Sequence, residues 1–150
     1  MAASIRPLAG PAMIPLRLML GTAPRRLMDF VRRHTPAPIE ELVVVGRHSG
    51  QDRSVLLTLV DAGPARYVLH PVPDRAGWVA NLRASGLATV VRKDGTRIPV
   101  RATYVDDGPE RDVAIDAAIR AQRFPASPPY RLARRGIHAT GRCFRLDPER

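Results

Sequence analysis

The stretch Gly46-Arg47-His48-Ser49-Gly50-Gln51-Asp52-Arg53 lies between two apolar runs, residues 42–45 and 55–60. Runs of β-branched and aliphatic residues predict strands, and a short Gly-bounded segment between them predicts a hairpin. Glycine at both ends gives the backbone the freedom that a tight turn needs. Arginine forks and a serine hydroxyl are groups that bind phosphate or carboxylate. The stretch therefore predicts a hairpin whose tip can hold an anion, and an ordinary solvated turn is the alternative.

Short apolar stretches separated by turn residues continue along the chain. They predict strands at about 39–45, 54–60, 66–70, 87–92, 97–105 and 137–146. Helices are predicted at about 24–34, 75–84 and 109–122, and a proline-rich loop at 124–130. About six strands with two or three helices predict a mainly β, α+β fold: a closed or split antiparallel β-barrel. The prolines at 36 and 38 divide a tail with a basic amphipathic helix, residues 1–35, from the barrel domain, residues 36–150.

A second motif, Trp78-Val79-Ala80-Asn81-Leu82-Arg83-Ala84, follows the third predicted strand. Together with Gly-Arg-x-Ser-Gly-x-x-Arg in the first hairpin and the order of the strands, it resembles the deazaflavin-dependent nitroreductase family over roughly residues 39–146. The resemblance implies a split β-barrel, flavin-reductase-like and related to FMN-binding barrels. It implies an oxidoreductase that transfers hydride from the reduced deazaflavin coenzyme F-420 to a quinone, nitro compound or similar acceptor. In such an enzyme the coenzyme carries the hydride and the protein orients it.

The resemblance also assigns site residues. Those implied for cofactor binding are Arg47, His48, Ser49, Gly50 and Arg53 at the hairpin tip, with Trp78 and Asn81 lining the same groove. Tyr130, after the proline-rich loop, is implied over the substrate as the catalytic residue. The residues alone leave alternatives open, because aromatic side chains commonly pack in cores. Trp78 can be a core residue, and Tyr130 can be an aromatic that caps the barrel.

The end of the third predicted strand departs from the resembled family. His70-Pro71-Val72-Pro73 stands where the family commonly has a small residue and a glycine-rich turn. Proline lacks the backbone N–H that glycine can offer a ligand. His48 stands where the family usually has lysine. These departures motivate the alternative of a non-catalytic flavin-, haem- or lipid-binding barrel of the same superfamily, with FMN as the alternative cofactor.

The composition favours an anionic partner. The formal net charge is +10 at pH 7, and Lys93 is the only lysine among the 24 basic residues. Such a charge attracts phosphates, carboxylates, acidic lipid or nucleic acid. Only 5% of the residues are aromatic, and neither a stacking platform nor a known nucleic-acid-binding module is evident. The composition therefore ranks a nucleic-acid partner last, and the resemblance implies a small-molecule hydride acceptor instead.

The basic segment at 14–34 has two interpretations. Its predicted helix either packs across the barrel, with arginine stems that reach solvent, or lies on an acidic membrane surface. We favour the first. No apolar stretch reaches the ~18 residues that a membrane span needs. We therefore expect membrane association only under the second interpretation. The single cysteine fits a reducing, cytoplasmic setting, and the family resemblance implies a monomer or homodimer.

Cys143 is the single cysteine, so the sequence excludes an internal disulfide. No spacing pairs it with His70 or His138 as a recognisable metal set. Its place in a predicted strand favours a buried, unreactive thiol.

Overall fold

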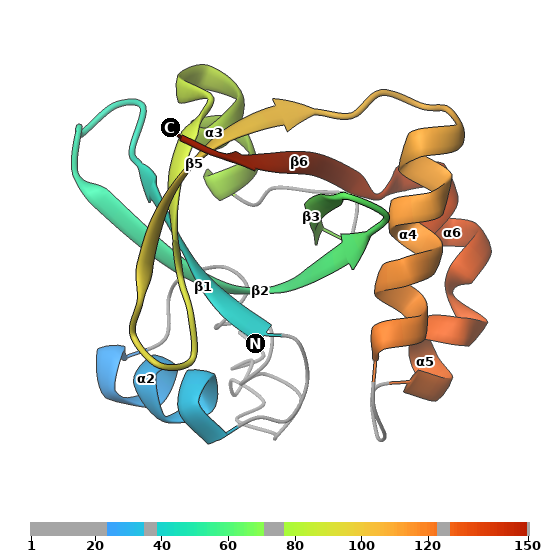
Figure 1. Cartoon of the computed structure of the whole chain (residues 1–150), viewed down its shortest axis with the longest axis horizontal. Coiled ribbons are helices and arrows are strands. Elements are labelled where there is room, and N and C mark those ends of the chain that lie inside the picture. Colours follow the sequence, from blue (N-terminus) through green and yellow to red (C-terminus); the bar gives the residue numbers. More distant parts are fainter. Residues whose placement is uncertain (1–23, 35–38, 71–76, 123–126, 150) are drawn as a thin grey trace, which may run out of the picture.

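The computed structural model describes residues 24–34, 39–70, 77–122 and 127–149. Within these residues the strands form a closed antiparallel barrel (Figure 1). They are β1 (Ile39–Val45), β2 (Asp52–Ala62), β3 (Ala65–His70), β4 (Leu87–Val91), β5 (Arg97–Tyr104) and β6 (Arg142–Pro148). Their order is β1-β2-β3-β6-β5-β4, and β4 pairs with β1 to close the barrel. The predicted barrel is confirmed.

Apolar side chains from all six strands fill the barrel. On the first hairpin, Leu42, Val44 and Leu57 point inward and are at most 2% exposed. Side chains alternate along a strand, so the residues between them face outward. Leu56 and Val60 face outward and are nevertheless buried, because helices cover them. Burial on both faces explains why β2 is a nearly continuous apolar run.

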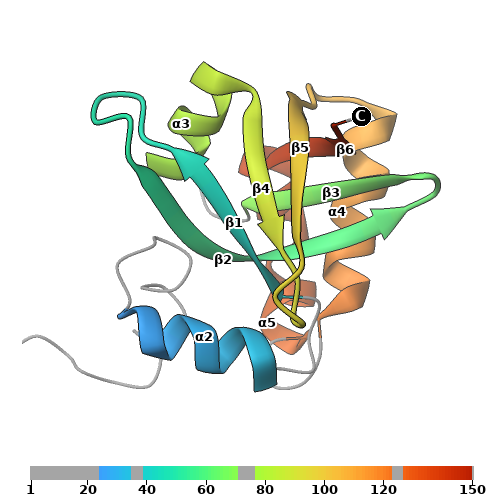
Figure 2. The same ribbon diagram turned by 60° about the vertical axis from the view of Figure 1, so that its left-hand side comes forward.

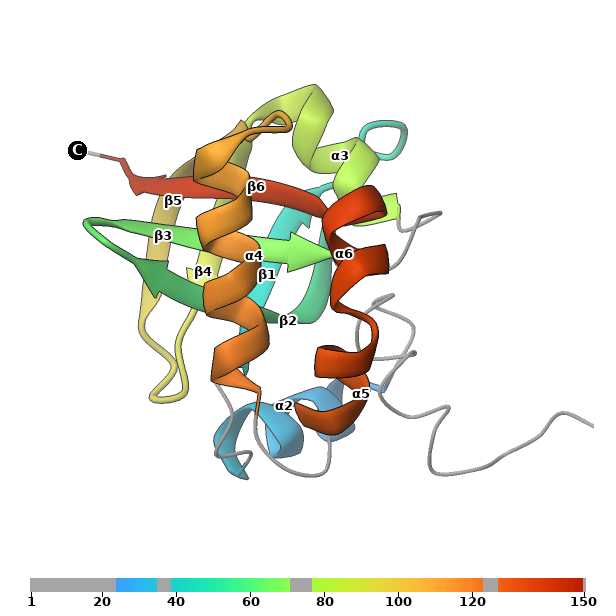
Figure 3. The same ribbon diagram turned by 90° about the vertical axis from the view of Figure 1, so that its right-hand side faces the viewer.

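The described helices are α2 (Arg25–His34), α3 (Gly77–Ser85), α4 (Pro109–Ala121), α5 (Ser127–Leu132) and α6 (Arg134–Thr140). Helix α3 joins β3 to β4, whereas α4, α5 and α6 join β5 to β6 and lie along the outside of the barrel (Figures 2 and 3). The β1–β2 loop and α3 lie at one end of the barrel, here called the tip end. The β2–β3 and β4–β5 turns lie at the other, here called the turn end.

Helix α4 has the start that its sequence predicts. Pro109 occupies its first turn, and Glu110 and Asp112 lie near the positive end of its dipole. Ala114 and Ala118, 2% and 0% exposed, bring the helix close to the outer face of β2. These small residues thus allow α4 to pack closely on the sheet.

The C-terminal part of the chain differs from the prediction. Residues 137–140 belong to α6, and β6 begins only at residue 142, so the predicted strand start at 137 was wrong. Ile137 is buried against α4, and Arg111 of α4 donates to the carbonyls of His138 (2.7 Å) and Gly141 (2.6 Å). These bonds satisfy carbonyls at the end of α6 that the helix leaves unpaired. Alternating apolar residues had mimicked a strand.

Residues 127–130 were predicted as loop and instead begin α5. Proline at the first turn of a helix replaces an N–H that would have no partner there, which makes this placement acceptable. The rest of the predicted loop, residues 124–126, lies outside the described residues. With α5 and α6, the described helices number five, so the predicted two or three was too few.

Helix α2 packs against the barrel, as the favoured interpretation of the basic segment expected, but Arg32 is buried and does not reach solvent. Glu41 of β1 is 1% exposed and accepts a hydrogen bond from Arg25. Arg32 Nε lies 3.5 Å from the second carboxylate oxygen of Glu41. The Arg32 guanidinium also donates to the carbonyl of Arg92 at 2.6 Å, which ties α2 to the turn after β4.

Cys143 is expected to resist thiol reagents in the folded protein. It is 0% exposed, as predicted, and burial raises the pKa of its thiol to about 12. Because the thiolate is the reactive form, labelling by a disulfide reagent at mildly alkaline pH should proceed only as fast as the protein unfolds. Absorbance of the released product, with and without urea, measures this. Native labelling as fast as that of glutathione would contradict the expectation.

Candidate functional site

The β1–β2 loop closes on itself through short hydrogen bonds. The Gly46 N–H donates to the carbonyl of Gln51, and the Gly50 N–H donates to the carbonyl of Gly46, both at 2.8 Å. Gly50 has φ +68°, and a Cβ on Gly46 would lie 2.7 Å from Ser49 Oγ. The positive φ therefore favours glycine at position 50, whereas a Cβ at position 46 would require the Ser49 side chain to shift. The hydroxyl of Ser49 accepts from the N–H of Gln51 at 3.2 Å and keeps its own proton for another acceptor.

One contact joins the two sequence motifs. Asn81 Oδ1, on α3, accepts from the backbone N–H of Arg47 and from its guanidinium, each at 3.1 Å. Asn81 is 9% exposed, so this link is largely shielded from water. Asn81 thereby holds the guanidinium of Arg47 against α3. The structure thus brings the hairpin tip and α3 together, as the resemblance implied.

The tip presents its polar groups to solvent. Five of the predicted cofactor-binding residues are exposed there: Arg47, His48, Ser49, Gly50 and Arg53. They include two guanidinium groups and a hydroxyl beside a tight turn. Such a surface suits a phosphate or carboxylate, since charge-assisted hydrogen bonds to an anion contribute about 1.5–3 kcal/mol each.

Trp78 lies inside the barrel. It is 3% exposed and packs with Phe144 at a centroid distance of 6.0 Å and edge-on with His70 at 5.6 Å. Trp78 is therefore positioned as a core residue, which was one of the two interpretations of its sequence context. Its Nε1–H is buried, and among the described residues no group accepts a hydrogen bond from it. A buried donor at the tip end is a group that a polar atom of a ligand could satisfy. Residues 71–73, the rest of the departure noted in the sequence, lie outside the described residues.

Tyr130 is not brought to the hairpin tip. It lies on α5, half-buried against the outer cluster between α4 and the barrel, whereas Trp78 belongs to the inner one. Figure 1 shows α5 and the β1–β2 loop at opposite sides of the molecule. Burial raises the pKa of the Tyr130 hydroxyl. Its position is that of an aromatic that caps the barrel.

Two absences hold for the described part of the chain. It contains no group of three or more His, Cys, Asp or Glu side chains placed to hold a metal ion. None of its helices is long and apolar enough to cross a membrane.

No protein-family model matches the chain, and no curated protein matches its sequence. Solved structures match its fold. An F420-H2 dependent reductase (FDR-A) aligns with TM-score 0.56 and 21% identity over 73% of this chain and 94% of that chain. A structure described as a domain-swapped dimer aligns with TM-score 0.57 and 19% identity over 81% and 92%. A heme binding protein from Mycobacterium smegmatis aligns with TM-score 0.54 and 16% identity over 85% and 52%.

The chain has the split β-barrel fold. Proteins of this fold thus include one described as a reductase and one described as heme-binding. At these identities the likeness of this split-barrel protein to them concerns the fold alone.

Proposed function

We propose that this split-barrel protein is a deazaflavin-dependent oxidoreductase that transfers hydride from reduced coenzyme F-420 to a quinone, nitro compound or similar acceptor. The observation that carries the proposal is the contact of Arg47 with Asn81. It joins the two motifs on which the family resemblance rests. The fold shared with an F420-H2 dependent reductase adds support.

The residues at the tip fit the anionic tail of such a coenzyme. The loop is closed, its glycines admit close approach, and two arginines and a serine face solvent. Arg47 and Arg53 would bind the phosphate, and the Ser49 hydroxyl would donate to it. Asn81 would hold Arg47 in place. When bound, the coenzyme supplies the hydride.

The protein's own part in this proposal is to bind and orient. No side chain has to act as nucleophile, acid or base, because hydride transfer between coenzyme and acceptor needs correct placement above all. Tyr130 has no part in the proposal, since it packs on the outer face of the barrel. A small-molecule acceptor would approach at the tip end, beside α3.

The Arg53→Ala variant tests the proposal. Loss of one charge-assisted hydrogen bond should weaken binding of oxidised coenzyme F-420 about tenfold to a hundredfold. Fluorescence titration of the purified protein measures this, with FMN titrated in parallel. Arg97→Ala is the matched control, because Arg97 is exposed on β5 at the turn end and should leave the affinity unchanged. Failure of the wild-type protein to bind the coenzyme at tens of micromolar would refute the proposal.

The second candidate is a barrel that binds a flavin, haem or lipid without turnover. The heme binding protein among the structural neighbours and the burial of Trp78 beside His70 favour it. Binding of FMN or haem but not of coenzyme F-420 would support this alternative. Steady acceptor reduction by reduced coenzyme F-420 that disappears in Arg53→Ala would argue against it.

Location and assembly complete the proposal. The exposed side of α2 carries Arg26, Phe30 and Arg33, a combination that suits contact with an acidic membrane surface. We propose that the protein is cytoplasmic and that α2 can also contact an acidic membrane surface. The chain would act as a monomer or homodimer, and a domain-swapped dimer of the same fold is consistent with the second state.

A further inference from the structure

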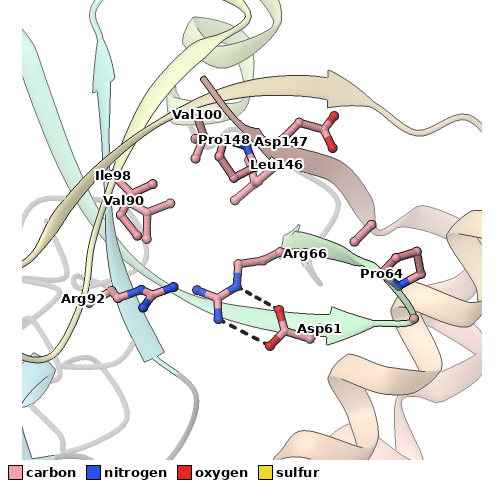
Figure 4. A pocket seen from close by; sticks show the side chains of 12 residues that line it. Asp61, Pro64, Arg66, Val90, Arg92, Ile98, Val100, Leu146, Asp147 and Pro148 are labelled. Carbon is pink, nitrogen blue, oxygen red and sulfur yellow. Dashed lines mark hydrogen bonds and ion pairs between the residues drawn. The ribbon is translucent and has the colours of Figure 1, made fainter. Parts of the chain in front are cut away.

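A cavity of about 390 Å³ opens at the turn end of the barrel, away from the hairpin tip (Figure 4). Residues of the β2–β3 turn, the end of β4, the start of β5 and the end of β6 line it. Its size lies in the range of small-molecule sites, about 300–1,000 Å³. None of the residues assigned to the proposed coenzyme site contributes to it.

The inner wall of the cavity is apolar. It is formed by branched side chains from three strands: Val90, Ile98, Val100 and Leu146. Val90, Val100 and Leu146 also belong to the barrel core and are at most 4% exposed, whereas Ile98 is only half-buried. This wall is continuous with the core, and a hydrocarbon group placed on it would be removed from water.

The rim of the cavity is charged. Arg66 donates to Asp61 at 2.9 Å and to Glu40 at 2.8 Å, and Asp147 accepts from Arg145 at 3.2 Å. These groups are therefore already held by partners. Their pairing fixes the Arg66 guanidinium at the mouth.

Arg92 differs from the other rim residues. Its backbone carbonyl accepts from Arg32 and its backbone N–H donates to Thr96, but within the described residues no acceptor contacts its guanidinium. Asp61, the acid on this side, is engaged by two nitrogens of Arg66, at 2.9 and 3.4 Å. Figure 4 shows the guanidinium groups of Arg92 and Arg66 pointing toward each other across the cavity. Asp61 interacts electrostatically with both Arg66 and Arg92. An anion between the two facing guanidinium groups would in addition satisfy donors of Arg92.

We propose that this cavity binds a small amphipathic carboxylate of the fatty-acid type. Its chain would lie on the apolar wall, and its carboxylate would accept from Arg92 and Arg66. A planar carboxylate matches the guanidinium fork, and one negative charge suits a rim that also carries Asp61 and Asp147 better than a doubly charged phosphate would. The site is independent of the proposed function at the tip end.

Titration of octanoate into isotope-labelled protein tests the proposal. Amide shifts should concentrate at residues 61–66, 90–92, 98–100 and 146–148. Arg92→Ala should weaken octanoate binding at least tenfold, while Arg97→Ala, which removes the same charge from a neighbouring position outside the cavity, should not change it. Octylammonium and 1-octanol, with the same chain and a positive or neutral head, should bind at least tenfold more weakly than octanoate.

Ile98→Asn provides a second variant, because it places a polar group on the half-buried part of the wall. It should weaken octanoate several-fold while thermal unfolding shows that the barrel remains folded. Equal binding of octanoate and octanol, an unchanged affinity in Arg92→Ala, shifts centred on residues 46–53, or no binding at millimolar concentration would each overturn the proposal. Coenzyme binding that weakens in Arg53→Ala but not in Arg92→Ala would separate this site from the tip.

Discussion

Glu41→Ala is expected to lower the free energy of unfolding by about 3 kcal/mol. The Glu41 carboxylate is 1% exposed and lies between Arg25 and Arg32 of α2. Arg32 is itself only 9% exposed, so without Glu41 a buried guanidinium loses one of its two carboxylate partners and keeps only Asp29, at 3.4 Å. Removing one partner of a buried ion pair costs more than the pair contributes, because the remaining charge stays desolvated.

Urea unfolding followed by fluorescence of Trp78, the single tryptophan, measures this effect. Glu149→Ala is the control: Glu149 forms an exposed ion pair with Arg101 at 3.4 Å, and its loss should change stability by less than about 0.5 kcal/mol. Glu41→Gln keeps the shape of the side chain. Its loss of unfolding free energy should lie between those of Glu41→Ala and Glu149→Ala. If Glu41→Ala unfolds within 1 kcal/mol of the wild type, the buried pair does not hold α2 as argued.

Arg111→Met is expected to destabilise the protein by about 3 kcal/mol and to loosen α6 in particular. Arg111 is 4% exposed, and its guanidinium donates to the carbonyls of His138 and Gly141. The Gly141 carbonyl is in a buried hydrogen bond and would lose its charged donor. Charge-assisted bonds of this kind contribute about 1.5–3 kcal/mol each. Methionine fills most of the space but cannot donate.

Hydrogen exchange separates the local effect from the global one. Amides of residues 137–143 should lose protection in Arg111→Met before those of β1 and β2 do. Arg120→Met, at an exposed position on the same helix, is the matched control and should leave both stability and exchange nearly unchanged. Uniform loss of protection across the barrel, with no excess at α6, would contradict this role of Arg111.

Local signals predicted most of the barrel. The first hairpin is marked by two apolar runs around a Gly-bounded loop, and α4 by Pro109 with acids behind it. The prediction for residues 137–140 was wrong because alternation is a local signal, whereas the end of this helix is held by bonds from Arg111, on another helix. Arg111 is distant in sequence, and no window of residues around 137 contains it.

The sequence could likewise predict one part of the functional surface and not another. The contact of Arg47 with Asn81 could be predicted from the sequence, because each residue belongs to a motif that the sequence displays. The cavity at the turn end could not be predicted, since Arg66 and Arg92 come from separate elements and neither stands in a recognisable motif. Only the closing of the barrel places their guanidinium groups face to face (Figure 4).

That closing also limits how two copies of this chain can associate. Each of the six described strands has a neighbouring strand on both sides, although β2 pairs with β1 only through residues 52–58 and with β3 only through residues 59–62. None of these strands therefore offers its whole length as an edge along which the sheet could extend from one copy into the next. We expect a homodimer to form instead through side chains on the outer surface or by exchange of a whole element between copies. Leu132, 93% exposed on α5, is an apolar side chain available to the first of these routes.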